Sequence, residues 1–319
     1  MDWSAAGVPM IATRAVHFAA TAMTVGSVIF DRFIALPVLR GHAAAAISFR
    51  SRTRRGIWVC LVLAVVSGAI WLLLQAASMS GMPLNEALTA DVLSTVINET
   101  QFGEVTAIRA GLAFCLAACL ACDRAVTTQW LGLAAATGFA GSLAWTGHAG
   151  STVGVTGYLH LAADALHGVA AAAWIGGLVS LITFLAITEI RENMLLARDA
   201  IERFSTLGIV SVAIILLSGV VNAGILVGSL HGLVATEYGR MLTLKLAIFA
   251  VMLAFAATNR FRLTPQLASS GNEQSSIALR QLIHNSAIEI ALGLGILVIV
   301  AVLGTLHPAV HMIDLTTSR

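Results

Sequence analysis

Eight long apolar stretches, separated by shorter polar segments, run along the 319-residue chain. Each stretch is long enough to cross a bilayer as a helix, which takes about 20 mainly apolar residues. The stretches cover residues 12–39, 57–77, 105–122, 128–146, 157–187, 203–228, 240–258 and 285–306. We therefore predict an all-α polytopic membrane protein with eight transmembrane helices surrounded by membrane lipid.

The composition supports this class and argues against a soluble domain. Hydrophobic residues make up 58% of the chain and charged residues 11%, with a mean hydropathy of +0.89. Soluble domains carry about 25% charged residues. The first stretch has no Lys or Arg before Arg14 and no convincing cleavage site, so we expect a retained span. The net charge of +2, spread over the loops, gives no reason to expect nucleic acid as a partner.

Basic residues are concentrated on one side of the predicted membrane domain. The connections after the first, third, fifth and seventh stretches hold most of them: Arg40, Arg50, Arg52, Arg54, Arg55, Arg124, Arg191, Arg198, Arg203, Arg260, Arg262 and Arg280. Loops rich in Lys and Arg stay on the cytoplasmic side. Both termini are therefore expected on the other side, which is the periplasm for a bacterial inner membrane.

An internal repeat divides the chain into halves. VHFAATAMT (16–24) matches LHLAADALH (159–167) and aligns His17 with His160. Further matches follow in the same order: Ser67-Gly68 with Ser218-Gly219, FGEVTAIR (102–109) with YGRMLTLK (238–245), and Thr146 and His148 with Thr305 and His307. We predict a duplicated four-helix unit, residues 1–148 and 157–311. Because four is an even number, the two repeats are expected to be parallel.

Histidines provide the main functional candidates. His160, Asp164 and His167 lie on one face at the start of the fifth stretch, because residues four and seven apart share a helix face. Imidazoles with a carboxylate suit Cu(II) or Zn(II). We expect these three residues to build a metal site on the outer side together with the other histidines placed there: His17, His148, His307 and His311. An interhelical hydrogen-bond network and a proton relay are the alternatives.

Sulfur-containing side chains offer softer ligands along the same route. Met10, Met79 and Met82 lie toward the outer surface. Cys115, Cys119 and Cys122 share one face in the inner half of the third stretch, where a row of thiols could pass Cu(I) inward. Ordinary packing in an apolar helix is the alternative for both groups.

Two cations lie about two turns inside predicted helices. Arg109 and Lys245 occupy matching positions of the repeat. A charge at this depth requires a partner or a route to water. We expect a salt bridge to Asp164 in an outer vestibule, with a cationic collar around an anionic cofactor as the second interpretation.

The second half resembles the copper resistance protein D (CopD) family. The motif WIGGL (174–178) carries the resemblance together with the stretch 203–260. Its marks are Arg203-Phe204-Ser205, Ser218-Gly219, Asn222, Tyr238-Gly239-Arg240, Lys245 and Asn259-Arg260. The resemblance is strong over about 157–311 and looser over the first half. It implies a non-enzymatic inner-membrane protein of copper transport and homeostasis that takes copper from the periplasm and contributes to copper resistance or uptake.

The resemblance also implies a partner. Family members often work beside a small periplasmic copper-binding protein of CopC type, and the outer loops here are too short to contain such a domain. A separate protein would have to fill that role. The sequence leaves open a homo-oligomer, since Gly224 and Gly228 form a GxxxG packing motif.

A haem protein is the alternative from another functional class. Paired outer histidines could serve as axial ligands for b-type haem, with Arg109 and Lys245 near the propionates. The pairs would be His17 with His148, and His160 with His307. That arrangement would make the protein an electron-transfer component or a metal reductase. The chain has no glycine-rich phosphate loop, so nucleotide-driven chemistry is not expected.

Overall fold

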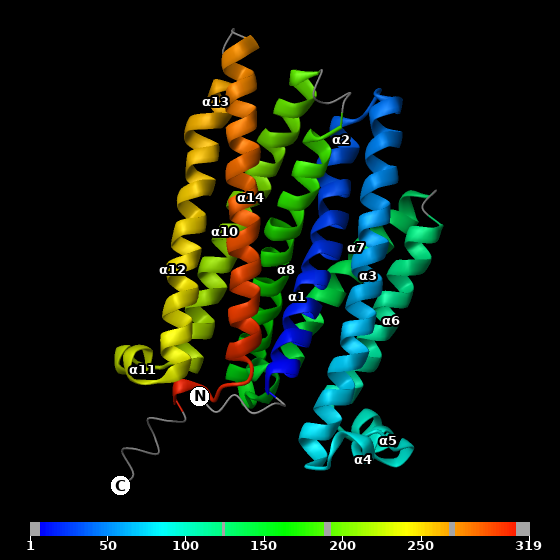
Figure 1. The fold of residues 1–319 in the computed structure, drawn as a ribbon, viewed down its shortest axis with the longest axis vertical. Coiled ribbons are helices and arrows are strands. Elements are labelled where there is room, and N and C mark those ends of the chain that lie inside the picture. Colours follow the sequence, from blue (N-terminus) through cyan, green and yellow to red (C-terminus); the bar gives the residue numbers. More distant parts are fainter. Residues whose placement is uncertain (1–6, 123–124, 188–192, 268–271, 311–319) are drawn as a thin grey trace.

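The computed structural model describes residues 7–122, 125–187, 193–267 and 272–310. Helices make up nearly all of this part of the chain, and they run along the length of an elongated bundle (Figure 1). No strand occurs among the described residues. The predicted all-α class is confirmed.

The helices follow one another with short connections. The first half contains α1 (Gly7–Phe30), π-helical η1 (Asp31–Ala35), α2 (Leu36–Val38), α3 (Ala43–Ser80), α4 (Leu84–Ala87), α5 (Ala90–Glu99), α6 (Gln101–Ala121), α7 (Val126–Gly141) and the 3₁₀ helices η2 (Ser142–Thr146) and η3 (His148–Ser151). The second half contains α8 (Gly154–Leu185), α10 (Met194–Leu226), α11 (Leu230–Ala235), α12 (Glu237–Thr258), π-helical η4 (Asn259–Leu263), α13 (Thr264–Gln266) and α14 (Asn272–Leu303).

Seven helical segments are long and apolar enough to cross a membrane. They are Gly7–Val38, Ala43–Ser80, Gln101–Ala121, Gly154–Leu185, Met194–Leu226, Glu237–Gln266 and Gln274–Leu303. The predicted span at 128–146 forms α7 and η2, and the 16 residues of α7 are too few for it to be counted among these seven. Seven of the eight predicted spans therefore have a helix of sufficient length, and the eighth stays a prediction.

The change from α7 to η2 occurs where Arg109 of the neighbouring helix α6 contacts the backbone. The Arg109 guanidinium of α6 donates hydrogen bonds to the Phe139 carbonyl oxygen (2.6 Å) and to Ser142 Oγ (2.9 Å). In a continuous α-helix the Phe139 carbonyl would accept from the amide four residues later. Arg109 competes for that acceptor where the helix tightens to 3₁₀ geometry.

The bundle is centred on the contact between α1 and α8, which pack directly against each other. A Cβ atom on Gly26 would lie 2.2 Å from the Ala172 carbonyl oxygen, and one on Gly176 would lie 2.2 Å from that of Ala22. Only glycine allows so close an approach. The contact is reciprocal, with each helix presenting a Gly and an Ala four residues apart.

The starts of α6 and α12 have the same local structure. Thr100 Oγ1 accepts a hydrogen bond from the Gly103 amide, and Thr236 Oγ1 accepts one from the Gly239 amide, both at 3.0 Å. Such a cap satisfies a helix amide that has no partner within the helix. A short helix precedes each cap, α5 in one half and α11 in the other. These contacts support the sequence match between 102–109 and 238–245.

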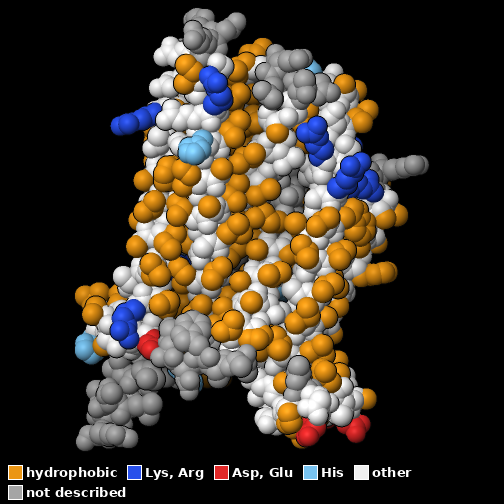
Figure 2. All heavy atoms as spheres, in the orientation of Figure 1, with side chains coloured by type: hydrophobic (Ala, Val, Ile, Leu, Met, Phe, Trp, Pro, Cys, Tyr) orange, Lys and Arg blue, Asp and Glu red, His pale blue; other side chains and the backbone are white. Residues whose placement is uncertain are grey.

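Basic side chains are concentrated at one end of the bundle. On the face that Figure 2 shows, most of the visible Lys and Arg side chains lie near α2 and α13, and Asp and Glu side chains lie near α4 and α5. We call these the arginine-rich end and the acidic end. The concentration of basic side chains agrees with the orientation predicted from the loops, which itself stays a prediction.

Candidate functional site

A cavity of about 430 Å³ lies among α1, α8, α10, α12 and α14. It extends from the acidic end, beside Gly304, to the middle of the bundle, beside Met252. Its wall is mainly apolar, and its polar lining includes Arg14, Thr146, His148, His160, Asp164, His167, Asn222, Tyr238 and Lys245. A largely apolar pocket with a few converging polar groups is the usual form of a binding site.

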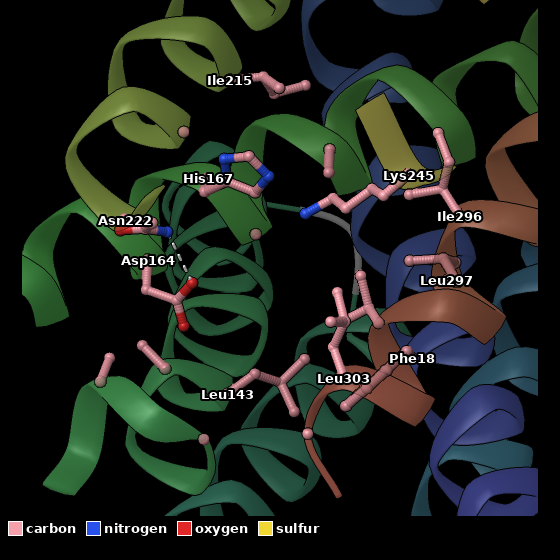
Figure 3. Close-up of a pocket in the computed structure, with 18 of the residues that line it drawn as sticks. Phe18, Leu143, Asp164, His167, Ile215, Asn222, Lys245, Ile296, Leu297 and Leu303 are labelled. Carbon is pink, nitrogen blue, oxygen red and sulfur yellow. Dashed lines mark hydrogen bonds between the residues drawn. The ribbon is translucent and has the colours of Figure 1, made fainter. Parts of the chain in front are cut away.

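The hydrogen bonds of His167 determine which ring nitrogen is free. Its Nδ1 lies 3.0 Å from Ser218 Oγ, and that hydroxyl donates its proton to the Ile214 carbonyl oxygen at 2.5 Å. The hydroxyl oxygen therefore accepts from Nδ1–H. Nε2 keeps its lone pair, and Figure 3 shows the ring at the cavity edge, across from the Lys245 amino group.

His160 is held in the same way near the start of α8, where it is 1% exposed. Its Nδ1 lies 2.8 Å from Thr152 Oγ1, which donates to the His148 carbonyl oxygen at 3.2 Å. This arrangement again leaves Nε2 with its lone pair. His148 lines the cavity as well, and its Nε2–H donates to the Leu303 carbonyl oxygen at 3.2 Å.

Two opposite charges face the cavity. Asp164 Oδ1 accepts a hydrogen bond from the Asn222 amide at 3.0 Å, and Lys245 points in from the other side (Figure 3). The two charges interact electrostatically. Within the described ranges the ion pairs are Arg198–Glu202 and Arg203–Asp199, so the expected salt bridge from Asp164 to Lys245 or Arg109 is not formed.

In the first half, the corresponding imidazole is fully engaged. His17 Nδ1 lies 2.9 Å from the Ala64 carbonyl oxygen, so this nitrogen carries the proton and donates it. Nε2 lies 2.8 Å from an Arg109 guanidinium nitrogen, which can only donate. Both ring nitrogens of His17 are therefore used within the protein. This geometry argues against His17 as a metal or haem ligand.

The contacts correct the register of the predicted repeat. His17 contacts Ser67 at 3.2 Å as His167 contacts Ser218 at 3.0 Å. His17 is therefore equivalent to His167, and its alignment with His160 is wrong. The two registers differ by seven residues, which is close to two turns, so both place a histidine on the same helix face.

The remaining predicted ligands of the outer side lie elsewhere. His307 is exposed, and His311 lies outside the described residues. Met10 packs beside the cluster of Phe18, Trp71 and Ala301, while Met79 and Met82 are about half exposed. Within the part of the chain that the structure describes, no three His, Cys, Asp or Glu side chains gather closely enough to hold a metal ion together. The predicted single site of converging histidines stays a prediction.

The cysteines of α6 lie away from the cavity. Cys119 is buried and Cys115 is partly buried beside the apolar cluster that α1, α6 and α7 share, whereas Cys122 is exposed. Neither Cys115 nor Cys119 is among the residues that line the cavity. These contacts agree with the packing alternative, and the thiol route stays a prediction.

Sequence reasoning did not assign the groups that orient the imidazoles. Thr152 holds His160, and Ser218 holds His167. Ser218 could have been identified from the sequence, because Ser-Gly recurs at matching places in the two halves. Thr152 could not, since it lies in a short segment between η3 and α8 that is not part of the repeat.

Comparisons with known proteins identify the family. The model described as Copper resistance protein D matches residues 198–303, and the one described as Copper resistance protein D-like, N-terminal domain, matches residues 4–158. Copper resistance protein D of Pseudomonas syringae pv. tomato is 31% identical over 285 residues, which cover 85% of this chain and 88% of the relative.

Two further relatives match nearly the whole chain. Inner membrane protein YebZ of Escherichia coli (strain K12) is 28% identical over 299 residues, covering 93% of this chain and 98% of the relative. Copper transport protein CutJ of Bacillus subtilis (strain 168) is 27% identical over 305 residues, covering 92% and 52% respectively. No solved structure matches. The chain therefore belongs to the copper resistance protein D family.

Proposed function

We propose that this multi-pass inner-membrane protein moves copper across the membrane and binds it first in the cavity beside His160 and His167. The names of two relatives, a copper resistance protein and a copper transport protein, support the cargo. Nothing in the comparisons supports the haem alternative. Copper is the transported ion in this proposal.

One observation carries the proposal. Two imidazoles of α8 donate their Nδ1 protons to protein oxygens and present Nε2 lone pairs, and both residues line the same cavity. Histidines that bind metals usually donate their other ring proton in this way, which fixes the ring. Asp164 supplies a carboxylate between them along the helix. A set of this composition suits Cu(II).

Copper binding requires these ligands to draw closer together. His160, Asp164 and His167 lie on successive turns of α8, about 5–6 Å apart along the axis. We propose that two of them bind the ion at a time, with a further ligand from water or from His148. The ion would then pass from one pair to the next along α8.

The orientation belongs to the same proposal. The arginine-rich end faces the cytoplasm, so the cavity receives copper from the periplasm. The two parallel four-helix repeats, the eighth span and the periplasmic termini are parts of this arrangement. A separate CopC-type copper-binding protein as donor, and assembly into a homo-oligomer, are further expectations from the family resemblance.

The test is metal content in purified protein. Wild type, His160→Ala and His167→Ala would be purified in detergent, loaded with Cu(II), desalted and assayed for copper together with the visible spectrum. The exposed His231→Ala is the matched control, because it removes an imidazole from α11 outside the cavity. We expect each α8 variant to bind copper at least tenfold more weakly, while the control binds like wild type.

Three results would contradict the proposal. The first is a wild-type protein that retains no copper under conditions where it is folded. The second is a Soret band that disappears in His160→Ala, which would identify a haem protein. Equal copper binding in wild type and both α8 variants would exclude these histidines as ligands.

A further inference from the structure

A second cavity of about 360 Å³ lies nearer the arginine-rich end. All of its lining residues belong to the second half of the chain, from α8, α10, α12, η4, α13 and α14. Its polar lining consists of Ser205, Asn259, Arg260, Thr264, Ser286 and Glu289. It is called the inner cavity here, and the histidine-lined one the outer cavity.

Trp174 separates the two cavities. Its side chain is 3% exposed and lines both of them, as does Leu216 of α10. Trp174 follows His167 on α8 by seven residues, or about 10 Å along the axis. Its indole packs edge-on against Phe249 of α12, with ring centroids 6.0 Å apart. Trp174, with Phe249 packed against it, thus forms an aromatic layer in the wall that the two cavities share.

Glu289 is the acidic group on the inner side of this layer. The residue is 1% exposed, and its carboxyl oxygen accepts a hydrogen bond from the Asn259 amide at 2.7 Å. Asn259 is oriented in turn by the Asn285 amide at 2.9 Å. Trp174 and Glu289 both line the inner cavity. Glu289 therefore faces the same space as the layer that closes the outer cavity.

The carboxyl group of Glu289 has no cationic partner within the described residues. Arg260 lines the same cavity, but its guanidinium donates to Ser205 Oγ at 2.5 Å. The described ion pairs both lie on exposed turns of α10. An acidic side chain deep in a membrane-spanning helix, without a partner of opposite charge, is a strong functional candidate.

We propose that the two cavities form one cation path through α8, α10, α12 and α14, closed by Trp174 and continued by Glu289. This inference rests on the proposed transport of copper. The ion leaves the histidines, passes the indole ring, whose face attracts cations, and reaches the Glu289 carboxylate. Carboxylate and amide oxygens from Glu289 and Asn259 then hold it before release at the arginine-rich end.

The first experiment measures copper flux into proteoliposomes that contain a fluorescent chelator. Glu289→Gln should lower the flux at least tenfold and leave copper binding at the outer cavity in detergent unchanged. Glu289→Asp should recover part of the flux because it keeps the charge. Glu99→Gln, an exposed carboxylate at the end of α5, is the matched control and should transport like wild type.

The outcomes distinguish this inference from the proposed function. A wild type that neither binds nor transports copper would refute the proposed function itself. Copper flux in Glu289→Gln equal to wild type would refute only the inner path. Loss of copper binding as well as flux in this variant would show that Glu289 supports the fold, which also overturns the inference.

The second experiment tests the aromatic layer. Trp174→Ala should make the proteoliposomes leak protons when a pH gradient is imposed, whereas Trp174→Phe should keep them tight because an aromatic ring remains. Trp130→Ala is the matched control, since Trp130 is 47% exposed on α7 and lines neither cavity. If vesicles that contain well-folded Trp174→Ala protein do not leak protons, Trp174 is not the barrier between the two cavities.

Discussion

Buried imidazoles in this protein differ in which ring nitrogen remains free. His17 uses both nitrogens in hydrogen bonds within the protein, whereas His160 and His167 each use Nδ1. We infer that the difference at His167 depends on Lys245, which stands where the predicted repeat places the counterpart of Arg109. A guanidinium reaches the imidazole, and the shorter ammonium group leaves it facing the cavity (Figure 3). One substitution therefore distinguishes a closed imidazole from an open one.

Lys245→Arg should close the open site. The guanidinium would donate a hydrogen bond to His167 Nε2 as Arg109 donates to His17. A lone pair that accepts this hydrogen bond is no longer available to bind the metal. We expect copper binding at least tenfold weaker than in wild type, measured by equilibrium dialysis in detergent. Lys245→Met is the paired variant, and it should bind copper at least as tightly because a positive charge next to the ion is removed. Unchanged binding in Lys245→Arg would show that His167 is not a ligand.

At the scale of single helices, the contact between α1 and α8 requires glycine on both sides. Gly26→Ala would place a methyl group 2.2 Å from the Ala172 carbonyl oxygen, so the helices must move apart. Overpacking of this kind costs about 1–3 kcal/mol. We expect a clearly lower thermal midpoint in detergent, measured by intrinsic fluorescence.

The control for this change is Gly111→Ala on α6. A Cβ there meets no heavy atom within 4 Å, and alanine favours helix over glycine by about 1 kcal/mol. Its midpoint should equal or exceed that of wild type. A Gly26→Ala protein as stable as Gly111→Ala would mean that the α1–α8 contact can relax, and that it does not fix the bundle.

Hydrophobic patterning predicted the apolar helices well, because a long apolar run in a membrane has few alternatives to helix. It did not predict their full length. The arginines at 50–55 were expected in a connection, but they lie on α3, which begins at Ala43 with a run of alanines that favour helix. The 3₁₀ geometry after Gly141 depends on Arg109, a residue of another helix, and so is absent from the local sequence.

The pattern along single helices predicted only part of the candidate site. The face of His160, Asp164 and His167 lines the cavity because helix periodicity alone brings these residues to one side. Whether His17 joins them depends on hydrogen bonds from α3 and α6, which no pattern along α1 reveals. Tertiary contacts therefore separate the two halves of a repeat that the sequence makes look equivalent.

At the scale of the whole molecule, the central question is whether α7 crosses the membrane. Its 16 α-helical residues cover about 24 Å, and the five 3₁₀ residues of η2 add about 10 Å. Together they match a hydrocarbon core of about 30 Å. The segment also runs between the two ends of the bundle. Shortly before α7 begins, the Leu120 carbonyl oxygen accepts a hydrogen bond from Arg54, and shortly after η2 ends, His148 donates one to the Leu303 carbonyl oxygen.

We therefore expect reporters fused on either side of α7 to lie on opposite sides of the membrane. Green fluorescent protein fused after residue 124 should fluoresce in the cytoplasm, and alkaline phosphatase fused after residue 151 should be active in the periplasm. Fusions after residues 40 and 81 flank α3 and provide the control, because α3 is long and apolar enough to cross a membrane. Fluorescence after residue 124 together with inactive alkaline phosphatase after residue 151 would place both fusion sites in the cytoplasm and leave seven spans. The two halves would then be antiparallel, which would contradict the predicted parallel repeats.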